Sequence, residues 1–185
     1  MNMIVLNLPK ASEIIEAKKD YEDEQKQLFE QYKAERREAI TEYVKEHLQD
    51  WLMEGIKQMQ EKHVTYYDYV VCQIPCDVVF KSYQHTRYYY REGNYSRSYA
   101  DAARDILIEV MDEILNAFTT QQKGIPRYYA RLGNTSDCLN ERELVYGVQR
   151  GDIRYYFNGY NSSGLKDIYE GGHFYIHMAV GITDK

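Results

Sequence analysis

The chain has 185 residues, of which 44% are hydrophobic, and its formal net charge is −6. This length fits one domain of ordinary size, with an appendage at most, and argues against two full domains. The negative charge argues against a nucleic-acid binder that works through bulk positive charge.

The cellular location of the protein can be inferred from its apolar segments and its cysteines. No segment approaches the roughly 18 uncharged apolar residues of a membrane span, so no membrane partner is expected. The opening stretch MNMIVLNLPK lacks the basic start and the apolar length of a signal peptide. The three cysteines, Cys72, Cys76 and Cys138, are odd in number and few, which favours reduced thiols. A cytoplasmic location is therefore expected.

A long helix is predicted for the first third of the chain. From Ala11 to Glu54 there is neither Gly nor Pro, and strong helix formers dominate. Ser12 is the expected N-cap, and the helix is expected to end near His63. Its second half carries apolar residues at three- and four-residue spacing, which predicts packing on a sheet: Ile40, Tyr43, Val44, Leu48, Trp51, Leu52, Ile56 and Met59.

The first half of that helix is highly charged. Tyr21, Leu28 and Tyr32 form a thin coiled-coil-like seam that predicts self-association and a homo-oligomer. A straight helix over residues 12–62 would be about 76 Å long, whereas the rest of the chain makes a body about 36 Å across. The helix then either bends back near residues 34–39, pairs with another chain, or stands alone on its ion pairs. We therefore divide the chain into a helical arm, 1–62, and a tyrosine-rich domain, 63–185.

The pattern after residue 63 changes to that of strands. Val64–Ile74 and Val78–Tyr90 are rich in Val, Tyr, Thr and Phe, and the break at Pro75 suggests a hairpin. Ser98 is expected to cap a second, amphipathic helix, with Asp101 three residues on. Further strands are expected at Arg127–Leu132, Leu144–Gln149, Ile153–Asn158 and His173–Thr183, with one helical turn at Leu165–Glu170. The predicted class is α+β, with a mainly antiparallel sheet of four to six strands and one amphipathic helix packed on it.

The segment from Tyr83 to Tyr99 has the composition most typical of a functional site in this chain. It contains six Tyr, three Arg, one His and a single acid. Tyr and Arg are enriched at protein-interface hot spots, and they also suit phosphate contact with base stacking. The alternative is a purely structural role, in which the rings pack on a sheet. We predict a partner-binding surface made by Tyr83, His85, Arg87, Tyr88, Tyr89, Tyr90, Arg91, Tyr95 and Arg97.

Catalysis and metal binding have weaker support. A metal-independent nuclease would use His85 as general base and Arg87 or Arg91 to stabilise negative charge. His173 and His177 have the spacing of a helical zinc pair, but their surroundings alternate as in a strand, where they would lie about 13 Å apart. Glycine-rich phosphate loops and a Gly-x-Ser-x-Gly elbow are absent from the sequence. We therefore expect no metal, no cofactor and no catalytic residue.

The hypothesis that follows is a non-catalytic macromolecular-interaction protein. It would bind a protein or nucleoprotein partner through the Tyr/Arg surface and the acidic helix, as an inhibitor, adaptor or small particle component. Short, acidic, tyrosine-rich chains of this kind occur among phage and mobile-element accessory proteins. The alternatives are a module that binds RNA or single strands, using also Arg127, Arg131 and Arg154, and the nuclease.

Overall fold

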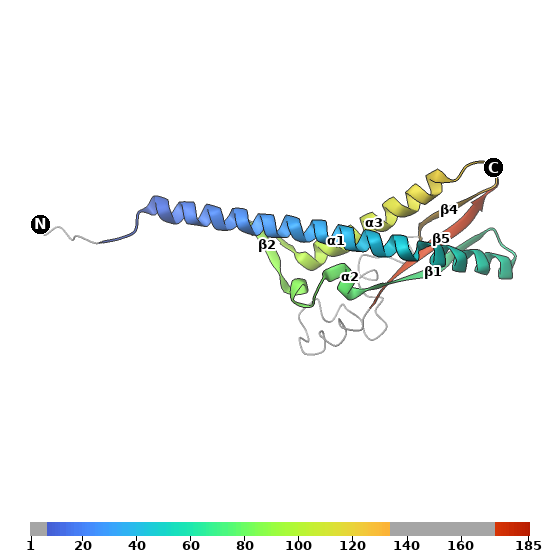
Figure 1. The fold of residues 1–185 in the computed structure, drawn as a ribbon, viewed down its shortest axis with the longest axis horizontal. Helices are drawn as coiled ribbons and strands as arrows, with labels where there is room; N and C mark the ends of the chain where they lie inside the picture. The colour runs from blue at the N-terminus through green and yellow to red at the C-terminus, as the bar shows by residue number, and fades with distance from the viewer. Residues whose placement is uncertain (1–6, 134–172) are drawn as a thin grey trace, which may run out of the picture.

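The computed structural model describes residues 7–133 and 173–185. It is elongated: a single helix runs along most of its length, and the sheet lies toward the end away from the N-terminus (Figure 1). Helices and antiparallel strands share one hydrophobic core, so the predicted α+β class is confirmed. The boundary between residues 62 and 63 stays a prediction.

Helix α1 spans Ala11–Lys62, 52 residues without a break. It is helical throughout residues 34–39, so the predicted alternative of a hairpin bend there is wrong. The end near His63 is confirmed, because that residue is left-handed (φ 54°) and its N–H donates to the Gln60 carbonyl. The start differs: Lys10 is the N-cap, without a side-chain cap, and Ser12 lies in the first turn. Helix ends commonly shift by one or two residues where no packing fixes them.

The second half of α1 packs into the core as predicted. Ile40 and Val44 are fully buried, and the other apolar residues of the predicted stripe are buried or packed against the core. Gly55 marks the closest approach to the sheet, since a Cβ there would lie 2.8 Å from a Val180 methyl and 2.9 Å from a Val70 methyl. This half of the helix covers β1 and touches β5.

The main sheet has three antiparallel strands in the order β1-β5-β4, with β5 in the centre. The strands are β1 (Tyr66–Pro75), β4 (Arg127–Leu132) and β5 (His173–Thr183), and the predicted bounds of β4 and β5 are confirmed. The predicted segments Leu144–Gln149, Ile153–Asn158 and Leu165–Glu170 lie outside the described residues. Among the described residues, no helix is both long enough and apolar enough to cross a membrane.

The predicted strand Val78–Tyr90 and its hairpin with the preceding strand are wrong. The chain instead forms a short helix, α2 (Cys76–Phe80), a 3-10 turn, η1 (Gln84–Arg87), and strand β2 (Tyr89–Glu92). β2 pairs with β3 (Tyr95–Ser98), and β1 pairs with β5. Buried residues at positions 76, 79 and 80 have the spacing of a helical turn that faces the core, and this packing overrides the strand propensity of the two valines.

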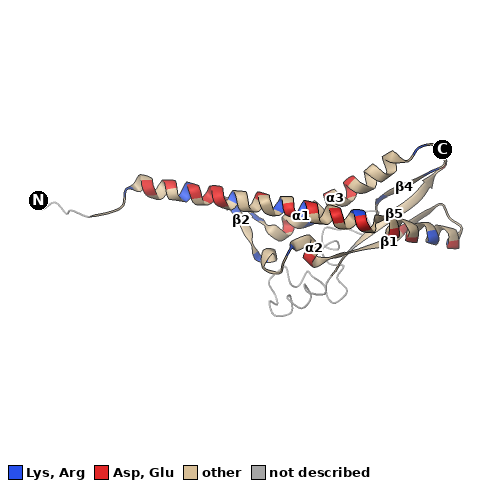
Figure 2. Ribbon diagram, viewed as in Figure 1, with Lys and Arg blue, Asp and Glu red and all other residues tan. Residues whose placement is uncertain are grey.

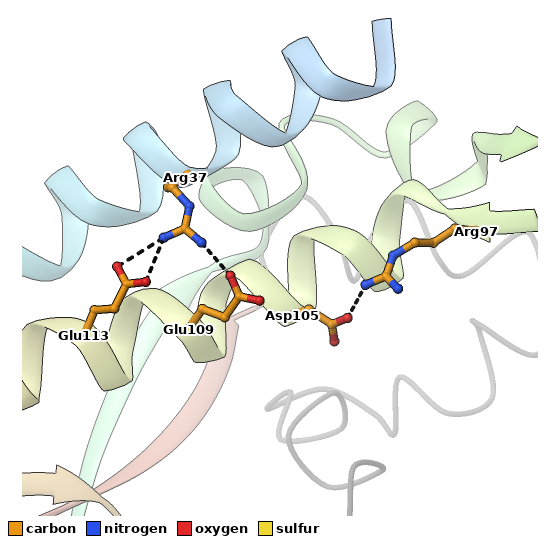
Figure 3. Close-up of polar contacts among 5 residues, drawn as sticks. All are labelled: Arg37, Arg97, Asp105, Glu109 and Glu113. Atoms are coloured by element: carbon orange, nitrogen blue, oxygen red, sulfur yellow. Dashed lines mark hydrogen bonds and ion pairs between the residues drawn. The ribbon is translucent and has the colours of Figure 1, made fainter. Parts of the chain in front are cut away.

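Helix α3 spans Tyr99–Gln121 and begins as predicted, with the Ser98 hydroxyl accepting from the Asp101 N–H at 2.9 Å. It packs against α1 and β4. On its outer side, Arg37 of α1 pairs with Glu109 and with Glu113, at 2.5 and 3.1 Å (Figure 3). The small β2–β3 ribbon lies against both helices, since α1 contacts β2 and α3 contacts β3.

Candidate functional site

The β2–β3 ribbon presents two different faces. Its two-residue turn contains Gly93, whose φ of +56° suits glycine. Side chains alternate along each strand, so Tyr89 and Arg91 point to one side and Tyr90 to the other. Tyr95 stands opposite Glu92 in the register and therefore shares the side of Tyr90. The predicted surface is thus divided between two faces.

The inner face is anchored by an aromatic cluster. The Tyr90 ring stacks on Phe29 of α1, with centroids 5.0 Å apart and planes 8° apart. Its hydroxyl donates to the Glu92 carboxylate at 2.7 Å, which raises the pKa of Tyr90 to about 12. Tyr99 packs on Phe29 and on Tyr32 at 5.0 and 4.7 Å. These contacts fix the ribbon to α1, so the residues on its outer side are held in place.

A groove of about 510 Å³ opens between α1, η1 and the start of β2. We call it the aromatic groove. Its wall on α1 is formed by Gln25, Leu28, Gln31, Tyr32 and Glu35, and the other wall by Lys81, His85, Arg87, Tyr88, Tyr89 and Tyr99. The site is therefore rich in rings, with a polar and partly basic rim.

His85 lies inside this groove and is held from two sides. Its ring stacks on Tyr32 at 5.4 Å and 8°, and its Nδ1 is 2.7 Å from the Ser82 hydroxyl. Burial lowers the pKa of His85, and the positive charges of Lys81 and Arg36 lower it further. The imidazole is therefore neutral near pH 7. Arg87, the proposed charge-stabilising residue of a nuclease, lines the same groove, and Arg91 lines neither groove of the ribbon.

The rim of the groove carries an ion pair. The Lys81 ammonium lies 2.5 Å from the Glu35 carboxylate, and hydrogen bonds from Lys81 and Gln31 lower the pKa of Glu35. Behind it, the buried Arg36 donates from Nη1 to the Val78 carbonyl at 2.9 Å, and its Nε has no hydrogen-bond partner in the described part of the chain. Among the described residues Arg36 makes no salt bridge, but its positive charge helps to lower the pKa of Glu35, so the two charges partly offset each other beside the groove.

A second depression of about 620 Å³ lies on the other face of the ribbon. Tyr95 and Arg97 line it, together with residues of α1 and α3. Arg97 pairs with Asp105 of α3 (Figure 3), so this predicted partner-binding residue has a contact within the chain.

The predicted residues therefore separate into distinct environments. Arg87, Tyr88, Tyr89 and Arg91 are exposed on one side, and we call these four residues the Tyr/Arg face. Tyr83 and His85 are half-buried beside them, Tyr90 is buried, and Tyr95 and Arg97 lie on the opposite side.

The residues predicted for self-association are also divided. Tyr21 and Leu28 are exposed, whereas Tyr32 is 4% exposed and its hydroxyl donates to the Phe80 carbonyl at 3.1 Å. Sequence reasoning missed the α1 wall of the aromatic groove. Its signal was present, because positions 28, 32 and 35 follow the spacing of one helix face.

The residues of the other hypotheses lie elsewhere. Arg127 and Arg131 are on β4, which Figure 1 shows at the far end of the molecule from β2, and Arg154 lies outside the described residues. His173 and His177 lie on one strand, as predicted. No cluster of three metal-ligating side chains occurs within residues 7–133 and 173–185.

The thiols that the structure describes are buried. Cys72 and Cys76 are both free, and burial raises the pKa of each, to about 12 for Cys76. Such thiols are unreactive near neutral pH, because the thiolate is the nucleophile. Cys138 lies outside the described residues.

Comparison with protein-family models, with curated proteins and with solved structures gives no match.

Proposed function

We propose that this chain is a non-catalytic macromolecular-interaction protein that binds a protein partner through the Tyr/Arg face and the adjoining aromatic groove. The role is that of an inhibitor, adaptor or small particle component. The observation that supports the proposal is the grouping of exposed Arg87, Tyr88, Tyr89 and Arg91 beside a ring-lined groove.

Packing beneath these side chains favours binding. Tyr88 lies edge-on to His85 at 5.2 Å and to Tyr99 at 5.7 Å, although 46% of its surface is exposed. A ring that is already ordered loses little conformational entropy when a partner covers it, and Tyr and Arg supply most hot-spot contacts. The aromatic anchors of an interface are therefore available before the partner arrives.

The test is site-specific photo-crosslinking in cells of the source organism. A photo-reactive residue at Tyr89 is expected to form a discrete adduct with one protein other than a second copy of this chain, and Arg87→Ala with Tyr88→Ala is expected to abolish it. Tyr95 is the matched control, because it is on the same ribbon and similarly exposed (51% against 57%) but points to the other side. Equal adducts at both positions, or none at Tyr89, would refute the proposal.

A module that binds single-stranded RNA is the second candidate. The observation in its favour is the pair of exposed rings, Tyr88 and Tyr89, next to the guanidinium of Arg87, a combination that stacks bases and contacts phosphates. Filter binding with a labelled RNA then shows an affinity that falls steeply with salt and drops with Tyr89→Ala. Absence of binding at about 50 mM salt would remove this candidate.

A further inference from the structure

The N-terminal arm, which we define as residues 11–24, projects beyond the rest of the molecule (Figure 1). All of its residues are exposed, and the first buried residue of α1 is Phe29. A helical segment of this length is marginal in water without tertiary packing. The arm nevertheless exposes large apolar side chains, with Ile14 at 62% and Tyr21 at 61%.

These apolar residues form a stripe with Leu28, which is 48% exposed. Ile14, Tyr21 and Leu28 are spaced by seven residues, so successive members lie within about 20° of the same direction on the helix. The stripe leads into the aromatic groove, because Leu28 lines that groove. Phe29 and Tyr32, the apolar residues that follow Leu28, are both buried, which ends the exposed stripe at the groove.

We propose that the arms of two copies of this chain pair antiparallel through this stripe. Ile14 of each copy lies against Leu28 of the other, and the two Tyr21 rings meet at the two-fold axis. The register then brings the first turn of each arm, residues 11–14, level with residues 28–31 of the other copy, at the mouth of its aromatic groove. Each groove is completed by the second copy, as expected for an isologous contact.

Charge selects the antiparallel orientation. The arm has six acidic and two basic residues, a net charge of −4, and four of the acids lie within residues 20–24. Figure 2 shows acidic residues along the projecting end of α1. Parallel arms would align that acidic stretch, residues 20–24, with itself. Antiparallel arms centred on Tyr21 leave Asp20 level with Glu22 but place Lys18 and Lys19 level with Glu24 and Asp23 of the other copy.

The aromatic groove is complementary to the first turn of the arm. That turn carries the acid Glu13 and the apolar Ile14, both exposed. The groove offers the rings described above for the apolar side chain and Arg87 on its rim for the carboxylate, whereas Lys81 is already paired with Glu35. Pairing of the arms therefore buries the apolar stripe, which is exposed within one copy, and adds an ion pair with Arg87.

The first experiment measures the mass of the full chain by sedimentation equilibrium over a range of concentrations. A reversible dimer is expected below about 100 µM. Ile14→Glu and Tyr21→Glu are expected to shift the chain to monomer. Ile15→Glu is the matched control, because Ile15 is as exposed (68%) but lies about 100° around the helix from the stripe, so this variant stays dimeric. A monomeric wild type, or dimerisation that survives Tyr21→Glu, would overturn the proposal.

The second experiment fixes the orientation by disulfide trapping in a chain with Cys138→Ser. A mixture of Ile14→Cys and Leu28→Cys chains is expected to give a cross-linked dimer on mild oxidation. Ile14→Cys alone is expected to give none, because antiparallel pairing separates the two copies of that residue by about 21 Å along the axis. Strong cross-linking of Ile14→Cys with itself would establish parallel pairing and contradict the proposal.

The pairing of the two arms does not depend on the proposed external partner. Arg91→Ala is expected to leave the dimer unchanged, because Arg91, unlike Arg87, does not line the groove. Failure of the dimer therefore leaves the crosslinking result at Tyr89 to be judged on its own.

Discussion

The two ends of helix α1 differ in what stabilises them. The N-terminal arm is exposed at every residue and depends within one copy on helix propensity and ion pairs such as Lys18–Glu22, whose charged atoms lie 3.5 Å apart. Residues 39–59 bury an apolar stripe against β1 and β5. Exposed i,i+4 pairs contribute about 0.3–0.5 kcal/mol, whereas a fully buried aliphatic side chain contributes about 1.5–3 kcal/mol. Burial, more than composition, decides which part of the helix is anchored.

The largest expected effect comes from truncating the same residue type at both ends. Ile40→Ala is expected to lower the free energy of unfolding by about 2–5 kcal/mol, because Ile40 is fully buried. Ile14→Ala is expected to change it by less than about 0.5 kcal/mol at low protein concentration. Urea denaturation followed by circular dichroism measures both. Similar losses for the two variants would mean that the ends of the helix do not differ as described.

Gly55→Ala tests how closely the packed half approaches the sheet. Alanine in a helix interior is ordinarily favoured over glycine by about 1 kcal/mol. Here the added methyl meets Val180 and Val70, so we expect a net loss of about 1 kcal/mol. The same denaturation assay gives the sign, with exposed Met53→Ala as control. A stabilised Gly55→Ala variant would show that the valines move aside.

Tyr32→Phe tests the part of α1 that lies between the exposed arm and the packed half. The substitution removes the hydrogen bond to the Phe80 carbonyl and is expected to cost about 1 kcal/mol. Tyr21 is a tyrosine of the arm and its ring is exposed. Tyr21→Phe is therefore expected to leave the free energy of unfolding unchanged in dilute solution. Equal effects at the two tyrosines would contradict the placement of Tyr32.

The smallest expected effect is the pH dependence from His85, which stacks on Tyr32 at this junction. Its pKa in the folded chain lies below the ordinary 6.5, so the unfolded chain binds more protons as the pH falls. The free energy of unfolding is therefore expected to fall below about pH 6.5 by more in the wild type than in His85→Gln. The nearby Glu35 opposes this effect, while Lys81 and Arg36 support it. Parallel pH profiles for the two proteins would show that His85 is not perturbed.

The sequence predicts the elements whose signals are local. The second helix begins after Ser98 as expected, because a capping residue marks its start. The strands Arg127–Leu132 and His173–Thr183 have the expected bounds, because strand-type composition with flanking turn signals marks each. The strand expected at Val78–Tyr90 fails, because contacts with α1 and the core decide the conformation of Cys76–Phe80. Propensity is a weak guide where tertiary packing competes with it.

The candidate site is predictable in composition but not in arrangement. The segment around Tyr88 and Tyr89 stands out in the sequence, and the structure places it on the surface. Which rings face outward depends on the β2–β3 register and on the stacking of Tyr90 on Phe29, a residue 61 positions earlier. The groove wall on α1 likewise comes from a distant part of the chain. The spacing of positions 28, 32 and 35 marks one helix face, but no local pattern pairs that face with residues 81–89.

The central position of β5 has a consequence for synthesis on the ribosome. β1 leaves the exit tunnel well before β5, since about a hundred residues separate them in the sequence. Until β5 is translated, the edge of β1 that pairs with β5 in the folded sheet lacks that partner, and such edges attract other strands. Chaperone binding during translation would therefore be needed most in the interval between these two strands.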